Sequence, residues 1–152
     1  MKAERISVSL IDGLAFEGEV NGFKIILDAE PQVGGKNRGP RPKPLMQLSL
    51  AGCTAMDVIS IIYKMRIELE EFKVHVDGEL TEEHPKHYSS MHLIYEFKGA
   101  NLPYPKLEKA VKLSQDRYCG VSYLYRKVMK LTYEILVHDT GTGETYSHFY
   151  EK

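Results

Sequence analysis

The sequence predicts an α+β protein, because strand-like and helix-like patterns follow one another in blocks along its 152 residues. Residues 1–30 show strand-like alternation, a long helical pattern follows, and the remaining half returns to strands with two short helices between them. The expected order is three strands, a long helix, two strands, two helices and two strands. We therefore expect a single domain with two antiparallel sheet regions around a central helix.

Apolar and polar residues alternate in three runs within residues 1–30: Ile6–Leu10, Leu14–Gly18 and Phe23–Leu27. A period of two residues is typical of half-buried strands. Asp12-Gly13 and Asn21-Gly22 separate the runs, and such dipeptides favour the positive-φ turns of β-hairpins. The pattern predicts a three-stranded meander.

A long helix is predicted over about residues 44–70. It follows a loop, residues 31–43, which is rich in Gly, Pro and basic residues and has no periodicity. Apolar residues then recur at steps of three and four, with Leu48, Ala55 and Ile62 on one face. Further apolar residues, such as Met56, fall off that face. We therefore expect a second covering surface, supplied by another copy in a homodimer.

Residues 71–152 predict the other half of the fold. The expected elements are a hairpin across Phe72–Phe97, a helix from Leu107 to near Tyr118, a short helix over Gly120–Lys130, and strands Leu131–Val137 and Glu144–Phe149.

Composition narrows the classes of function and the compartment. The 20 Lys and Arg nearly balance the 21 Asp and Glu, so general nucleic-acid binding lacks an electrostatic basis. We expect no stretch long enough to cross a bilayer, no secretion signal and thus no membrane association, which predicts a cytoplasmic protein. Two cysteines far apart in such a chain predict reactive or buried thiols rather than a structural disulfide framework.

Cys53 lies on the predicted long helix, nearly opposite the face of Leu48, Ala55 and Ile62 and on the side of Asp57. Both a reactive thiol and an inert, partly buried one fit this position. Asp57 disfavours a thiolate there, and the helix dipole fades before it reaches Cys53.

A reactive Cys53 therefore requires a nearby cation. The candidates are Arg38, Arg41 and Arg117, in that order, and the alternative for each is a solvated loop charge.

Cys119 lies at the junction of the two predicted short helices. Gly120 is expected to interrupt the helical conformation there. Cys119 would then lie close to a helix N-terminus that favours a thiolate, with Ser122 as the cap. Two cysteines in such settings suit one chemistry. The first attacks an O–O bond and becomes a sulfenic acid, and the second condenses with it to a disulfide.

Two segments resemble one known family. The run GPRPKPLMQLSLAGCTAMDVISIIYKMR is similar to the GPSPMELLLAALGGCTAMDV-type segment of OsmC/Ohr proteins, and DRYCGVS is similar to their YCPVS motif. The resemblance implies the OsmC-like fold in an intertwined homodimer. It also implies thiol-dependent reduction of organic hydroperoxides, with Cys53 peroxidatic and Cys119 resolving, an external thiol or dithiol as reductant, and no metal or organic cofactor.

Four features depart from the family pattern. The usual Glu before the first cysteine falls on Lys43 or Pro44, and Gly120 replaces the usual Pro. The catalytic Arg of the N-terminal segment has no clear match, so Arg38 or Arg41 would substitute for it. The CTAMD form is similar to a less-characterised branch of the family.

Two other readings compete with a peroxidase. A zinc site would join the cysteines to His84 and His87, whose spacing is typical of ligands although they lie in a polar turn. A non-catalytic module would instead bind an apolar or thiol-bearing small molecule. Its pocket would be lined by Met46, Met56, Met65 and Tyr63.

Overall fold

In a computed structural model, which describes residues 4–151, the chain forms two compact units. The first extends to Met46 and the second begins at Gln47. Residues 1–3 and 152, the ends of the predicted single domain, lie outside the described residues.

The first unit contains the predicted meander. Its strands β1 (Val8–Asp12), β2 (Ala15–Val20) and β3 (Phe23–Leu27) pair antiparallel in that order. Gly13 and Asn21 adopt φ values of 53° and 52°, which confirms both predicted turns. The loop after β3 contains one 3-10 turn, η1 (Pro31–Val33). Most side chains of the meander are exposed within the unit, so their alternation does not correspond to burial there.

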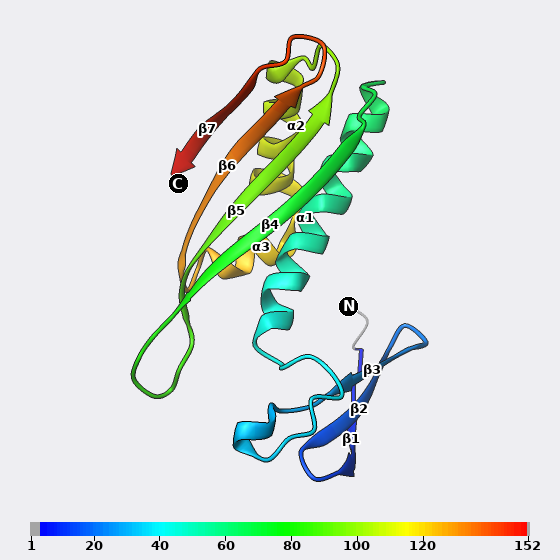
Figure 1. Cartoon of the computed structure of the whole chain (residues 1–152), viewed down its shortest axis with the longest axis vertical. Coiled ribbons are helices and arrows are strands. Elements are labelled where there is room, and N and C mark those ends of the chain that lie inside the picture. The colour runs from blue at the N-terminus through cyan, green and yellow to red at the C-terminus, as the bar shows by residue number, and fades with distance from the viewer. Residues whose placement is uncertain (1–3, 152) are drawn as a thin grey trace. The chain divides into compact units, whose positions relative to one another are not determined.

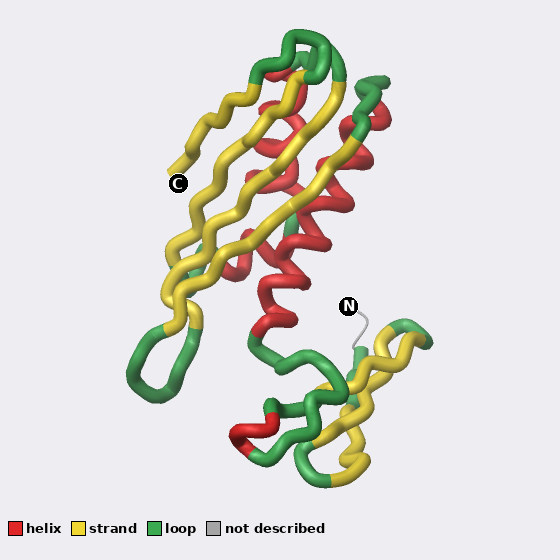
Figure 2. The backbone as a smooth tube through the Cα atoms, in the orientation of Figure 1, coloured by secondary structure: helices red, strands yellow, loops and turns green. Residues whose placement is uncertain are grey.

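The second unit is a four-stranded sheet with helices on one face (Figures 1 and 2). Its strands, in spatial order, are β4 (Glu71–Leu80), β5 (Tyr88–Gly99), β6 (Lys130–Asp139) and β7 (Thr145–Glu151). Its helices are α1 (Pro44–Lys64), which begins just before the unit, α2 (Tyr104–Leu113), the π-helical turn η2 (Ser114–Tyr118) and α3 (Gly120–Tyr125). The α+β class and the long central helix are thus confirmed.

One expectation about this sheet is wrong. We expected antiparallel pairing throughout, but β5 and β6 are parallel while the outer pairs are antiparallel. The connection between them passes through α2, η2 and α3, and a crossover of this kind returns the chain in the same direction. The sheet is therefore mixed.

Helix α1 ends at Lys64, earlier than the predicted residue 70. Arg66 adopts φ 56°, its N–H bonds to the Tyr63 carbonyl, and the Ile67 N–H bonds to the Ile62 carbonyl. These are the two hydrogen bonds of a Schellman motif, which closes a helix through a left-handed residue. The apolar residues that continue the pattern beyond Lys64 therefore belong to the connection to β4.

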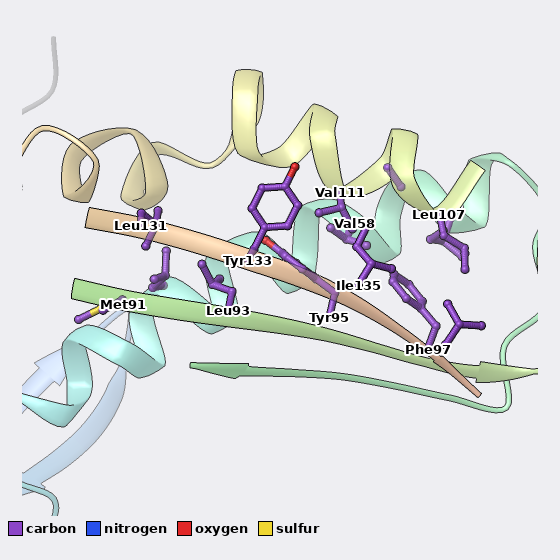
Figure 3. Close-up of a cluster of buried hydrophobic side chains, with 14 of the residues drawn as sticks. Val58, Met91, Leu93, Tyr95, Phe97, Leu107, Val111, Leu131, Tyr133 and Ile135 are labelled. Atoms are coloured by element: carbon purple, nitrogen blue, oxygen red, sulfur yellow. The ribbon is translucent and has the colours of Figure 1, made fainter. Parts of the chain in front are cut away.

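The buried face of α1 also differs from the predicted one. Leu50, Thr54, Val58 and Ile62 are fully buried, whereas Leu48 is 66% exposed. They pack in the core between sheet and helices, where Figure 3 shows Tyr95 and Tyr133 rising from β5 and β6. Because the true face is rotated from the predicted one, Cys53 lies at its flank and not opposite the core.

The expectation that no segment is long enough to cross a bilayer is wrong on length and composition. Helix α1 has 21 residues with a mean hydropathy of 1.6 over an 18-residue window, and among the described residues it is the one helix long and apolar enough to cross a membrane. The core helices of soluble proteins can be equally long and apolar. In this chain, one side of α1 is buried against the sheet of the second unit.

Candidate active site

The two cysteines meet in the second unit. The sulfurs of Cys53 and Cys119 and a carboxylate oxygen of Asp57 all lie within 4.8 Å of one another, and both cysteines are free. Cys53 and Asp57 are one turn apart on α1, and Cys119 stands between η2 and α3. The fold thus answers a question that the sequence left open, because it brings the two thiols together.

The backbone conformation around Cys119 sets the orientation of its side chain. Its N–H bonds to the Ser114 carbonyl at 2.9 Å, the i to i−5 bond of a π-helical turn, a distortion that is frequent at functional sites. Cys119 then takes an extended conformation and becomes the N-cap of α3, where its sulfur accepts the Ser122 N–H at 3.3 Å. We expected Ser122 to be the cap, which is wrong: Ser122 instead supplies the capped N–H.

Cys53 is partly exposed, whereas Cys119 is 3% exposed. Partial burial raises the pKa of the Cys53 thiol above its usual range, and Cys119 and the charge of Asp57 act in the same direction. A hydrogen bond from the backbone N–H of Val121 acts in the opposite direction. The unfavourable effect of Asp57 that the sequence predicted is therefore confirmed, and the surroundings described so far favour a neutral thiol.

A chain of buried hydrogen bonds lies beside the sulfurs. Ser114 donates to Asp57 at 3.1 Å, so its only hydroxyl hydrogen is used and Thr54 must donate to Ser114 at 2.8 Å. Thr54 has then used its own hydrogen, so Tyr95 donates to Thr54 at 2.6 Å. Gln115 in turn donates its amide N–H to the Tyr95 oxygen at 2.5 Å.

Arg126 supplies the other end of this chain. Its guanidinium donates to the side-chain oxygen of Gln115 at 2.7 Å and to the backbone carbonyl of Gln115 at 3.1 Å. The bonds therefore run with one polarity from the Arg126 cation to the Asp57 carboxylate, so that each strengthens the next. Within residues 4–151, the buried Nε of Arg126 has no hydrogen-bond partner.

The sequence analysis missed most residues of this hydrogen-bond chain. Of its members it had singled out only Asp57, because Thr54, Ser114, Gln115 and Arg126 are polar residues that an apolar pattern ignores. Their signal is structural: Thr54, Ser114 and Gln115 are almost completely buried, and buried polar groups require partners.

The arginines proposed to activate Cys53 lie in the first unit. Arg38 makes a two-pronged ion pair with Asp12, at 2.7 Å for both nitrogens, and its Nε lies 3.2 Å from the buried Asp28. Hydrogen bonds from Arg38 and Lys36 lower the pKa of Asp12 to about 2. Arg41 donates to the side chain of Asn37 at 2.6 Å. Their role at Cys53 remains a prediction.

The other candidate residues are not gathered at the sulfurs. Arg117 stacks over the Tyr118 ring, with 5.5 Å between the guanidinium carbon and the ring centroid. His84 and His87 lie in the exposed turn between β4 and β5, where His87 bonds to the Pro85 carbonyl. Among the described residues, the group that converges with both cysteines is Asp57 rather than a histidine.

A small open pocket of about 330 Å³ leads to Asp57. Its walls combine apolar and polar side chains: Asp57, Ser60, Ile61, Lys64, Leu113 and Tyr118. The pocket therefore reaches the Asp57 side of the site, while neither cysteine is among its lining residues.

Known proteins of the same fold carry similar sequences. Residues 35–134 match the model of the family described as OsmC-like protein. Protein YhfA of Escherichia coli K12 is 30% identical over 132 residues, which cover 85% of this chain and 96% of YhfA. The crystal structure of a hypothetical protein from Aquifex aeolicus VF5 superposes with a TM-score of 0.78 at 27% identity and covers 90% of this chain and 97% of that one.

A more distant likeness concerns a protein whose function is described. The organic hydroperoxide resistance protein OsmC of Legionella pneumophila, a predicted redox protein, superposes with a TM-score of 0.65 at 15% identity. The match covers 89% of this chain and 97% of the Legionella chain, and at this identity it shows the fold alone. With the family model matched across both cysteine motifs, the chain belongs to the OsmC-like protein family.

Proposed function

We propose that the protein reduces organic hydroperoxides with thiols as the source of electrons. The observation that carries the proposal is the meeting of two free sulfurs within 4.8 Å, one partly exposed and the other buried. Such a pair suits an attacking and a resolving thiol, since the attacking sulfur must be reached by the substrate. The description of the distant Legionella relative as an organic hydroperoxide resistance protein supports this choice of substrate.

The proposed reaction has three steps. The Cys53 thiolate attacks the O–O bond of ROOH, which with one proton gives a Cys53 sulfenic acid and the alcohol ROH. The Cys119 thiol then condenses with the sulfenic acid, so that a disulfide forms and water leaves. Two external thiols, or one dithiol, reduce the disulfide by exchange and are themselves oxidised to a disulfide.

The first step needs positive charge at Cys53. Because burial, Cys119 and Asp57 raise the pKa of this thiol, a cation must offset them for a thiolate to form near neutral pH. We infer that Arg38 or Arg41 supplies that charge. We also infer a cytoplasmic location, since the cycle consumes reduced thiols.

The test is mass spectrometry of the fully reduced protein after one equivalent of cumene hydroperoxide, in the presence of a chelator. The expected product is a Cys53–Cys119 disulfide formed in step with loss of the hydroperoxide. Cys119→Ser should stop at a Cys53 sulfenic acid that dimedone traps, and Cys53→Ser should consume no hydroperoxide. Two intact thiols beside unreacted hydroperoxide would contradict the proposal and favour a non-catalytic module that binds small molecules.

A further inference from the structure

Three potential metal ligands converge at the cysteine pair. The two sulfurs and the Asp57 carboxylate are soft and hard anionic donors of the kinds that zinc accepts. In a tetrahedral zinc site with Zn–S bonds of about 2.3 Å, neighbouring ligand atoms lie about 3.8 Å apart. The three atoms here all lie within 4.8 Å of one another, so shifts of about 1 Å would close the site.

Each of the three ligands already has a hydrogen-bond donor. Val121 N–H bonds to Cys53, Ser122 N–H bonds to Cys119, and Ser114 donates to Asp57. Donors of this kind orient metal ligands and stabilise their negative charge. Ser114 is itself held by the hydrogen-bond chain that begins at Arg126, so the Asp57 carboxylate has a fixed donor, and Asp57 also lines the pocket beside Ser60 and Lys64.

We propose that the reduced protein binds one zinc ion through Cys53, Cys119 and Asp57, with water as the fourth ligand. Binding exchanges the two thiol protons for the metal, so that two protons are released and the affinity rises with pH. The ligands differ from those that the sequence suggested, because His84 and His87 lie in the β4–β5 turn and bond elsewhere or face solvent.

Zinc binding does not require the proposed peroxidase activity. The two nevertheless exclude each other at any moment, because a Cys53–Cys119 disulfide removes both thiolate ligands. Zinc would therefore protect the reduced pair from oxidation, and oxidation by any route would release the ion.

The experiment titrates the full-length reduced protein with cobalt chloride and then zinc chloride under anaerobic conditions. We expect one ion per chain, a thiolate-to-cobalt charge-transfer band in the near ultraviolet, and displacement of cobalt by zinc. Asp57→Asn, which keeps an oxygen acceptor for Ser114, should weaken binding at least tenfold. Asp77→Asn, the same charge change on an exposed residue of β4, and the double variant His84→Gln, His87→Gln should bind as the unaltered protein does.

A second arm separates this proposal from the peroxidase. Protein oxidised with diamide, which forms the disulfide without a hydroperoxide, should bind no cobalt, and reduction should restore the band. Absence of the charge-transfer band in reduced protein, or equal affinity of Asp57→Asn and Asp77→Asn with both folded by circular dichroism, would overturn the zinc site. Neither result depends on whether cumene hydroperoxide is consumed.

Discussion

At the scale of single residues, Asp57 places a negative charge beside both thiols. Its carboxylate lies within 4.8 Å of both sulfurs and is held there by Ser114. It raises the pKa of Cys53, so it acts against the thiolate that the proposed reaction needs. In the metal-free protein Asp57 thus suppresses the reactivity of the Cys53 thiol, and in the proposed zinc-bound state it would be a metal ligand.

Replacing Asp57 by Asn should accelerate alkylation of Cys53. Removing the negative charge lowers the pKa of the thiol, so the thiolate fraction at pH 7 rises and the midpoint of the pH profile moves to lower pH. Like charges about 4.8 Å apart interact by roughly 1 kcal/mol even in bulk water and by more near a protein surface, which predicts an increase of at least about 4-fold. Iodoacetamide rates from pH 6 to 10, in chelator, measure the effect, with Asp77→Asn as the control. An unchanged midpoint would contradict the assigned role.

Replacing Arg38 or Arg41 should have the opposite effect on the alkylation of Cys53. If either guanidinium approaches Cys53 in the assembled protein, its removal should slow alkylation near pH 7 and move the midpoint upward. Arg38→Ala and Arg41→Ala are compared with Lys24→Ala, which removes an exposed cation paired with Glu17 in the same unit. Arg38→Ala also leaves the buried Asp28 short of a donor, so its thermal unfolding is recorded alongside. Equal rates in all three variants would exclude both arginines from the mechanism.

At the scale of elements, one hydrogen-bond chain ties four segments to the site. It starts at Arg126 just after α3, passes through Gln115 in η2 and Tyr95 in β5, and reaches α1 at Thr54. Every member is part-buried or buried, so a break leaves polar groups without water or partner. This hydrogen-bond chain therefore fixes the position of α1 relative to η2. It thereby also fixes the positions of the two cysteines.

Arg126→Met should destabilise the protein. Methionine keeps much of the apolar stem but removes both donors to Gln115, whose buried oxygens then lose their partners at a cost of about 1–3 kcal/mol. Urea unfolding followed by circular dichroism measures the free energy. The matched control is Lys127→Met, one residue along and exposed, where the change should stay within about 0.5 kcal/mol. Similar losses in the two variants would show that the chain contributes little.

Periodicity predicted the order of the strands and of the main helices, but α1 ends six residues and α3 five residues before the predicted ends, and the details that shape the site were missed. It missed the parallel pairing of β5 with β6, because strand direction depends on the connection and not on alternation. It also placed Leu48 on the buried face of α1, where Thr54 lies instead. A threonine in the core carries no apolar signal, and its burial is stabilised by Tyr95 and Ser114, which are distant in sequence.

For the site too, the sequence predicted some features and not others. Cys53, Asp57 and the position of Cys119 before a short helix could be read from local sequence, since each depends on residues within one or two turns. Their meeting could not, because it depends on the crossover that brings η2 against α1. The shared segment CTAMD and the second motif YCGVS suggested it only through resemblance to a family.

At the scale of the whole molecule, each unit leaves large apolar side chains uncovered. On α1, Met56 and Tyr63 are 73% and 70% exposed. Together with Phe72 they line an open groove of about 760 Å³. In the first unit, Leu10 and Phe23 are exposed as well. Contiguous exposed apolar surface is unusual for a monomer and marks surfaces that associate. We propose that a second copy covers these faces, as expected for a helix with apolar residues all round.

Sedimentation velocity should therefore show a dimer at micromolar concentration, and Met56→Glu should shift it toward monomer. A carboxylate buried in an apolar groove without a partner should weaken association by at least about tenfold, or roughly 1.4 kcal/mol. The matched control is Val128→Glu, which places the same charge on an exposed apolar residue outside the groove and should leave the dimer intact. If the unaltered protein sediments as a monomer, the exposed faces need another partner. If instead Val128→Glu alone dissociates the dimer, the interface lies over α3 rather than along α1.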